Sequence, residues 1–110
     1  MNRDGRLQVV ARCVPWLAVG FLGLSATGCG GVFYAYYATS ASSKVSEAKA
    51  VGAESRAPYE YYSSVEYMKK ASEEASQADY GDAIDLASKA EDHADKAIKL
   101  ARDAHKGEGR

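Results

Sequence analysis

A stripe of small side chains on one face of a predicted helix constrains this chain more than any other feature. Alanines alternate at four- and three-residue steps near the end of the sequence: Ala83, Ala87, Ala90, Ala94, Ala97, Ala101 and Ala104. This alternation places side chains on a single face of an α-helix. Because alanine allows two backbones to approach closely, we expect Ala90 and Ala94 to lie at a helix–helix contact. The helix should run from about Gly81 to Lys106.

Two further segments with helical periodicity precede this stripe. The first, over residues 40–51, has apolar residues at Ala41, Val45, Ala48 and Val51 and should fade at Gly52. It should begin before Ser40, because Tyr34, Tyr37 and Ala38 are in register with this stripe. The second begins at Pro58, a residue suited to the first turn of a helix. Its apolar face comprises Tyr61, Val65, Met68, Ala71, Ala75 and Ala78.

The expected fold is all-α. Only a few residues around Asp79 separate the last two helices, and so short a connection forces an antiparallel hairpin. Asp79 is the expected N-cap of the last helix. With the segment from Ser40, the antiparallel helical hairpin is extended to a three-helix bundle that follows a cleaved N-terminal signal peptide.

Residues 1–28 have the three parts of a secretory signal peptide. Arginines make the start basic, an apolar run covers residues 14–24, and small residues close the segment. The apolar run is shorter than the roughly 20 residues that a membrane-spanning helix needs. We therefore expect this segment to be removed on export.

The sequence Ala26-Thr27-Gly28-Cys29 resembles the lipobox of bacterial lipoproteins, in which small residues precede a cysteine; Ala26 stands where leucine is commoner. The resemblance implies cleavage between Gly28 and Cys29 and acylation of Cys29, which would hold the protein on a membrane of the bacterial cell envelope. Because Gly30 rather than an aspartate follows, the expected location is the outer membrane, facing the periplasm. The alternative is an ordinary secretory signal with an incidental cysteine. Apart from this covalent lipid, no cofactor is expected.

Residues 29–39 are expected to form a lipid-anchored linker with an interfacial aromatic segment. Gly30 and Gly31 predict a loose joint, and Phe33, Tyr34, Tyr36 and Tyr37 follow within six residues. Tyrosine favours the membrane–water interface, so we expect these rings to sit there, with core packing as the alternative. The predicted organisation is a signal peptide at 1–28, the linker at 29–39, a helical domain at 40–106 and a disordered tail at 107–110.

The charge pattern excludes several functions. Of 14 bases and 15 acids, three arginines and Asp4 precede Cys29, so 11 bases and 14 acids remain and residues 29–110 carry a net charge of −3. These charges are mixed, without the basic stripe of a nucleic-acid-binding protein or a polybasic patch for anionic lipids. Acids precede bases by four residues at Glu66–Lys70, Asp85–Lys89, Asp92–Lys96 and Asp95–Lys99, which predicts ion pairs on the solvent side.

No catalytic or metal-binding motif is found in the sequence. His93 and His105 are twelve residues apart, so they do not form an i, i+4 metal pair, and we expect a solvated helix face around His93. Neither a phosphate-binding glycine loop nor a nucleophile elbow is present. We therefore expect no enzymatic activity, no catalytic residue and no metal.

Four tyrosines near the start of the second helix are the candidate binding surface: Tyr59, Tyr61, Tyr62 and Tyr67. Their rings could stack on the sugars of peptidoglycan or bind a partner protein. The alternative is that they pack the entrance of the hairpin as core residues.

The helical body resembles two known families. The segment 78–84, Ala-Asp-Tyr-Gly-Asp-Ala-Ile, followed by Lys89-Ala90, resembles the turn and second helix of a tetratricopeptide repeat, without a second copy at a 34-residue period. Residues 38–104 are similar to the helical domain of small bacterial envelope lipoproteins, a domain without an assigned function. Relatives sometimes place it ahead of an OmpA-like peptidoglycan-binding domain, for which this chain is too short. We therefore expect a lipid-anchored structural or protein-interaction module with an envelope protein as partner; the alternative is peptidoglycan binding.

Overall fold

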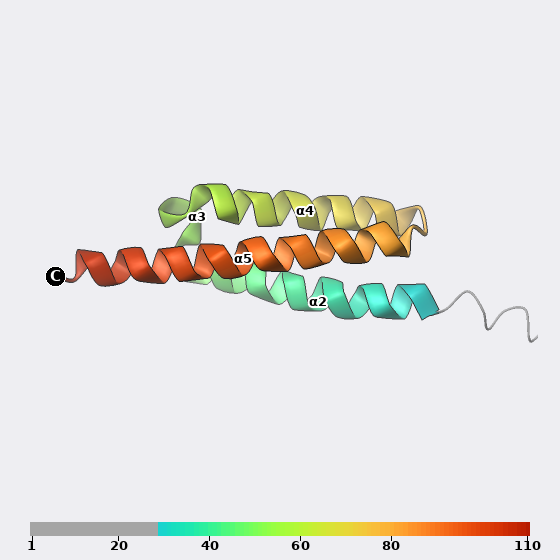
Figure 1. Cartoon of the computed structure of the whole chain (residues 1–110), viewed down its shortest axis with the longest axis horizontal. Helices are drawn as coiled ribbons and strands as arrows, with labels where there is room; N and C mark the ends of the chain where they lie inside the picture. Colours follow the sequence, from blue (N-terminus) through green and yellow to red (C-terminus); the bar gives the residue numbers. More distant parts are fainter. Residues whose placement is uncertain (1–28) are drawn as a thin grey trace, which may run out of the picture.

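The computed structural model describes residues 29–110, and over this range the chain is an all-α bundle (Figure 1). Its helices are α2 (Cys29–Ala50), α3 (Ala53–Arg56), α4 (Pro58–Ser76) and α5 (Tyr80–Glu108). Helices α2 and α5 run in the same direction and α4 runs antiparallel to both. The predicted all-α fold is confirmed. The predicted signal peptide, with Gly28 on one side of the cleavage point, lies outside the described residues.

Helix α5 lies between α2 and α4, and its alanine stripe faces both of them. The six alanines from Ala83 to Ala101 have no exposed surface, so the predicted helix–helix contact at Ala90 and Ala94 is confirmed. Ala104, the last alanine of the stripe, is exposed. Figure 1 shows the reason, because the C-terminal end of α5 continues past the other helices.

Most of the buried side chains are alanines. At the middle of the bundle, Ala41 of α2 and Ala71 of α4 meet Ala87 and Ala90 of α5. Towards α3, a second cluster contains Ala48, Ala53, Ala57, Tyr61, Ala97, Ile98 and Ala101. Such small contact residues bring the helix axes close together, and the larger apolar side chains pack around them.

The connections between helices follow the predicted signals in part. Gly52 ends the first helix with a left-handed backbone (φ 76°), which glycine adopts without a steric cost. The one-turn helix α3, which the sequence did not predict, then fills the link to Pro58. At the other end of the bundle the carboxylate of Asp79 accepts a hydrogen bond from the Asp82 N–H at 3.4 Å. Asp79 is thus the N-cap of α5, as expected.

Residues 29–39, predicted as a linker, form the first half of α2, so the helix begins before Ser40 as expected but the loose joint predicted at Gly30 and Gly31 is wrong. The glycines serve a close approach rather than a loose joint. A Cβ atom added to Gly30 would lie 2.7 Å from the ring of Tyr80, in the first turn of α5. The ring of Tyr34 also packs near Tyr80, with centroids 6.5 Å apart. Contact with α5 therefore stabilises the helical conformation of residues 29–39, a segment that the two glycines alone would make flexible.

The last helix extends two residues past its predicted end at Lys106. Helix α5 continues through Gly107 to Glu108. The guanidinium of Arg56, in α3, donates a hydrogen bond to the Glu108 carboxylate at 2.9 Å. This ion pair ties the last turn of α5 to α3, and the first two residues of the predicted disordered tail at 107–110 are helical.

Candidate functional site

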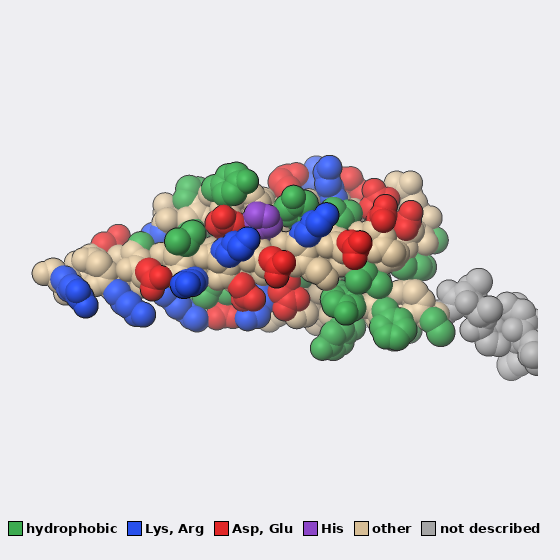
Figure 2. All heavy atoms as spheres, viewed as in Figure 1, with side chains coloured by type: hydrophobic (Ala, Val, Ile, Leu, Met, Phe, Trp, Pro, Cys, Tyr) green, Lys and Arg blue, Asp and Glu red, His purple; other side chains and the backbone are tan. Residues whose placement is uncertain are grey.

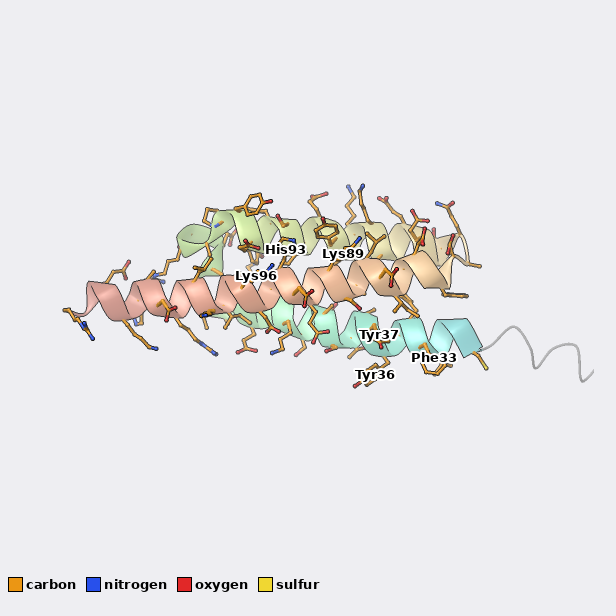
Figure 3. All side chains as sticks on the ribbon, viewed as in Figure 1. Phe33, Tyr36, Tyr37, Lys89, His93 and Lys96 are labelled. Atoms are coloured by element: carbon orange, nitrogen blue, oxygen red, sulfur yellow. The ribbon has the colours of Figure 1, made fainter. Side chains whose placement is uncertain are left out.

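The first candidate surface is the outer face of the first turns of α2, which we name the anchor patch. It comprises Cys29, Val32, Phe33, Tyr36 and Tyr37. Phe33 is 62% exposed and Tyr36 is 73% exposed. Figure 3 shows Phe33 and Tyr36 pointing away from the bundle, and Figure 2 shows apolar side chains gathered over this part of the molecule. No charged residue occurs between Cys29 and Ser43.

The predicted interfacial rings divide between two environments. Phe33, Tyr36 and Tyr37 lie outside the bundle, whereas Tyr34 packs against the central core cluster. Cys29, the predicted lipid attachment point, is exposed at the start of the helix. No helix between Cys29 and Arg110 combines the length and the apolarity that crossing a bilayer requires.

The second candidate surface is a groove of about 560 Å³ along the exposed side of α4, which we name the tyrosine groove. Its lining residues are Pro58, Tyr59, Tyr62, Ser63, Glu66, Tyr67 and Lys70. Tyr59 is 75% exposed and Tyr62 is 52% exposed, whereas Tyr61 is only 7% exposed and belongs to the core. Of the four tyrosines predicted from the sequence, three therefore line one groove, and the core alternative describes Tyr61.

Residues outside the groove hold its rings in place. Tyr67 stacks on the imidazole of His93, from α5, with ring centroids 5.3 Å apart and an angle of 19°. Tyr59 meets the same imidazole edge-on at 6.4 Å. On the far side of the groove the Tyr62 hydroxyl donates a hydrogen bond to the Glu54 carboxylate at 3.0 Å, and this carboxylate raises the pKa of Tyr62.

The expectation of a solvated helix face around His93 is wrong. Its side chain is 21% exposed, and Nδ1 lies within hydrogen-bonding distance of the Glu60 carboxylate of α4. The two residues are 33 positions apart in the sequence, so spacing could not reveal the pair. One feature of the sequence indicates that His93 faces another helix: it lies seven residues from both Leu86 and Leu100, on the same flank of the alanine stripe.

Charges of both signs lie at the tyrosine groove, because Glu66 lines it and Glu54 accepts the hydrogen bond from Tyr62. Lys70 lines it, and Figure 3 shows Lys89 and Lys96 on either side of His93. Among residues 29–110 none of these three lysines forms an ion pair.

Lys44 and Arg102 at the α2–α5 seam and Arg56 of α3 form ion pairs, whereas Lys99 of the same seam forms none among residues 29–110. Lys44 binds Asp95 at 2.9 Å, and Arg102 binds Glu47 at 2.7 Å. The ion pairs predicted at four-residue spacing are therefore wrong. Asp95 pairs with Lys44 of α2 instead of with Lys99. The other predicted pairs lie on one exposed helix face, where an ion pair contributes only about 0.3–0.5 kcal/mol, too little to hold two long side chains together.

A group of three carboxylates, from Glu74, Asp79 and Asp82, lies at the α4–α5 turn. Their oxygens lie within 4.8 Å of one another, and the sequence did not predict this group. Asp79 already caps α5, and exposed acidic groups of this kind commonly bind no ion. We assign no function to it.

Comparison with known proteins gives one match. The family model for a domain of unknown function (DUF4398) matches residues 37–108. The match begins at the last residue of the anchor patch, covers the whole tyrosine groove and ends with α5. No curated protein and no solved structure matches the chain.

Proposed function

The chain belongs to the DUF4398 family, whose domain has no known function, and we propose that it is a lipid-anchored module of the bacterial cell envelope. In this proposal residues 1–28 are a signal peptide that is cut between Gly28 and Cys29. Acyl chains on Cys29 hold the helical bundle on the outer membrane, facing the periplasm. The bundle serves as a structural or protein-interaction module for another envelope protein.

The anchor patch is the observation that carries this proposal. Along α2 the rise of about 1.5 Å per residue puts Tyr36 about 10 Å from Cys29. Acyl chains on Cys29 would therefore bring the exposed rings of Phe33 and Tyr36 to the lipid headgroups, where aromatic side chains are favoured. The lack of charge before Lys44 removes the desolvation cost of placing this face against lipid.

The interaction role is supported by the length of the bundle. Helix α2 has 22 residues and is about 33 Å long. Its C-terminal end, α3 and the start of α4 thus lie well away from Cys29 along the bundle. An envelope protein can reach this end of the molecule without entering the lipid.

Fractionation of cells tests the anchor. The wild-type chain should remain in the membrane fraction after washes with high salt and with alkaline carbonate. Cys29→Ser should lose this retention, because residual contact of the anchor patch is too weak without acyl chains. Cys13→Ser, which changes the other cysteine of the chain, is the matched control and should behave like wild type. Equal membrane retention of Cys29→Ser and wild type would contradict the proposal.

A second candidate function is glycan binding, and the tyrosine groove favours it. Its exposed rings are fixed by neighbours on two helices, which is typical of a binding surface rather than of incidental surface aromatics. Retention on purified sacculi, compared with capture of proteins from solubilised membranes, separates glycan binding from protein interaction.

A further inference from the structure

We propose that the anchor patch seats on a lipid surface of low negative charge, and that the acidic α4–α5 turn beside it sets this preference. On such a surface the patch and the turn both reach the lipid headgroups. On an anionic surface the turn is held away and only the patch makes contact. This inference rests on the lipid anchor proposed above and names the kind of lipid that the anchor end of the bundle fits.

The start of α2 and the α4–α5 turn lie at the same level of the bundle. Tyr80, the first residue of α5, directly follows the turn. A Cβ atom added to Gly30 would lie 2.7 Å from the Tyr80 ring, and the ring of Tyr34 packs 6.5 Å from it between centroids. Figure 1 shows the turn beside the first half of α2. Acyl chains on Cys29 would therefore bring the turn to the headgroups together with the patch.

The patch and the turn differ in charge. Residues 29–43, which include the patch, contain no charged side chain. Residues 71–88, which include the turn, contain five acids and no base: Glu73, Glu74, Asp79, Asp82 and Asp85. Glu74 is half-buried and the other four are exposed, and none of the five forms an ion pair within residues 29–110. Figure 2 shows acidic side chains gathered over this end of the molecule, next to the apolar side chains of α2.

The nearest lysines reduce this charge without cancelling it. Lys69, Lys70 and Lys89 are the bases closest to the turn in the sequence, and with them residues 66–89 hold six acids and three bases, a net charge of −3. Residues 44–65 hold three acids and three bases, and residues 90–110 hold five of each, with the histidines neutral. The whole net charge of residues 29–110 therefore lies in the half of the bundle that contains the anchor patch.

Compensation of helix dipoles explains only part of this charge. Asp82 lies in the first turn of α5, where an acid is favoured. Glu73 and Glu74 lie in the last turn of α4, where acids are disfavoured and where no base is present. The stability of α4 therefore does not account for these two acids.

Anionic headgroups would repel the turn. At about 1.5 Å per residue, all five acids lie within about 8 Å of the turn along the bundle. The negative potential of an anionic lipid surface extends over a similar distance, since the Debye length is about 8 Å at physiological ionic strength. The uncharged patch does not respond to this potential. The anchor end thus attaches through the patch and discriminates between lipid surfaces through the turn.

Two tryptophan reporters test this in the full chain, acylated at Cys29 and reconstituted into liposomes. Phe33→Trp reports on the patch, and Gln77→Trp, at the exposed C-terminal cap of α4, reports on the turn. The liposomes contain brominated phosphatidylcholine, alone or mixed with phosphatidylglycerol. We expect Phe33→Trp to be quenched equally in both lipids. Gln77→Trp should be quenched in phosphatidylcholine, lose most of its quenching when phosphatidylglycerol is added, and regain it at high sodium chloride concentration, which shortens the Debye length.

Two double variants locate the charge that matters. In the Gln77→Trp background, Glu73→Gln with Asp82→Asn should keep the tryptophan quenched in the presence of phosphatidylglycerol. Asp92→Asn with Asp103→Asn removes the same charge from the other half of the bundle. This matched control should lose its quenching as the parent does. Circular dichroism confirms that each variant is folded.

Three results would overturn the inference. Equal quenching of Gln77→Trp in both lipids would mean that the turn does not discriminate between them. Recovery of quenching in the Asp92 and Asp103 control would assign the effect to total charge rather than to the turn. Phe33→Trp without quenching in either lipid would overturn the lipid anchor together with the inference, whereas the first two results, with Phe33→Trp quenched, would leave the anchor standing.

Discussion

Two tyrosines in the first turn of α4 differ in what their rings contribute to the fold. Tyr61 is buried in the core cluster near α3, whereas Tyr59 projects into solvent. Tyr61→Ala should lower the free energy of unfolding by about 3–5 kcal/mol, the range for removal of a large buried aromatic side chain. Tyr59→Ala should change it by no more than about 0.5 kcal/mol. Urea denaturation followed by circular dichroism measures both, and equal losses would contradict the assignment of Tyr61 to the core.

The alanine stripe gives a second residue-scale prediction. Ala90 is fully buried where α2, α4 and α5 meet, so Ala90→Leu should overpack the contact and cost about 1–3 kcal/mol. Ala104→Leu, on the same stripe but beyond the contact, is the matched control and should leave stability nearly unchanged. The melting temperatures of the two variants, from thermal unfolding, measure this difference. A melting temperature that does not fall for Ala90→Leu would mean that the stripe is not tightly packed.

At this scale the sequence predicts residues whose environment follows from local spacing. The buried alanines follow from a four–three period, and the capping role of Asp79 follows from its place before α5. The pairing of His93 with Glu60 does not follow from any spacing, because it depends on how α4 and α5 are aligned. The division between Tyr59 and Tyr61 depends on which face of α4 meets α5. Hydrophobicity alone does not distinguish two tyrosines.

Among the elements, the C-terminal turn of α5 is expected to respond to pH. Arg56 holds the pKa of the Glu108 carboxyl below its ordinary value of 4.5. A carboxyl with a lowered pKa in the folded state stabilises that state at higher pH and loses this contribution as pH falls through the folded pKa. The helical Cα chemical shift of Lys106 should therefore decrease as the pH falls below about 4.5. The effect should be small, because the pair is exposed.

The Glu108→Gln variant provides the comparison for this titration. Without the carboxylate the last turn should be less helical at neutral pH, and its chemical shifts should not follow the wild-type transition. A wild-type transition that persists in Glu108→Gln would show that another group, such as Asp103, controls the end of the helix.

The bounds of elements are predictable where a strong local signal marks them. Pro58 and Asp79 correctly mark the starts of α4 and α5, and Gly52 marks the end of α2. The start of α2 is not predictable in this way, because Gly30 and Gly31 suggest flexibility when read alone. Their role becomes clear only when Tyr80 packs against them. The ion pair of Arg56 with Glu108 likewise extends α5 past Gly107.

On the scale of the whole molecule, the anchor patch lies at one end of the bundle and the tyrosine groove begins at the other. The patch lies at the start of α2, beside the α4–α5 turn, whereas the groove begins at the first turn of α4, beside α3. A lipid on Cys29 would therefore leave the groove facing away from the membrane. The proposed anchor and the tyrosine groove can act in one molecule at the same time.

This arrangement predicts which aromatic residues meet lipid. The one tryptophan of the chain, Trp16, lies in the proposed signal peptide, so a new tryptophan is a clean reporter. With the acylated protein in liposomes, Phe33→Trp should show blue-shifted emission and quenching by brominated lipids. Tyr59→Trp, at the groove, should show neither effect. Quenching of both reporters to the same extent would mean that the bundle lies flat on the membrane.

Mass spectrometry of the purified mature protein decides the claim that acylated Cys29 holds the bundle on a bacterial membrane. The mature protein should begin at Cys29 and carry a diacylglyceryl group on the sulfur, with or without a further acyl chain on the amine. Its N-terminal peptide should lose this added mass when Cys29 is changed to Ser. A mature protein with a free thiol at Cys29, or one that retains residues 1–28, would contradict the claim.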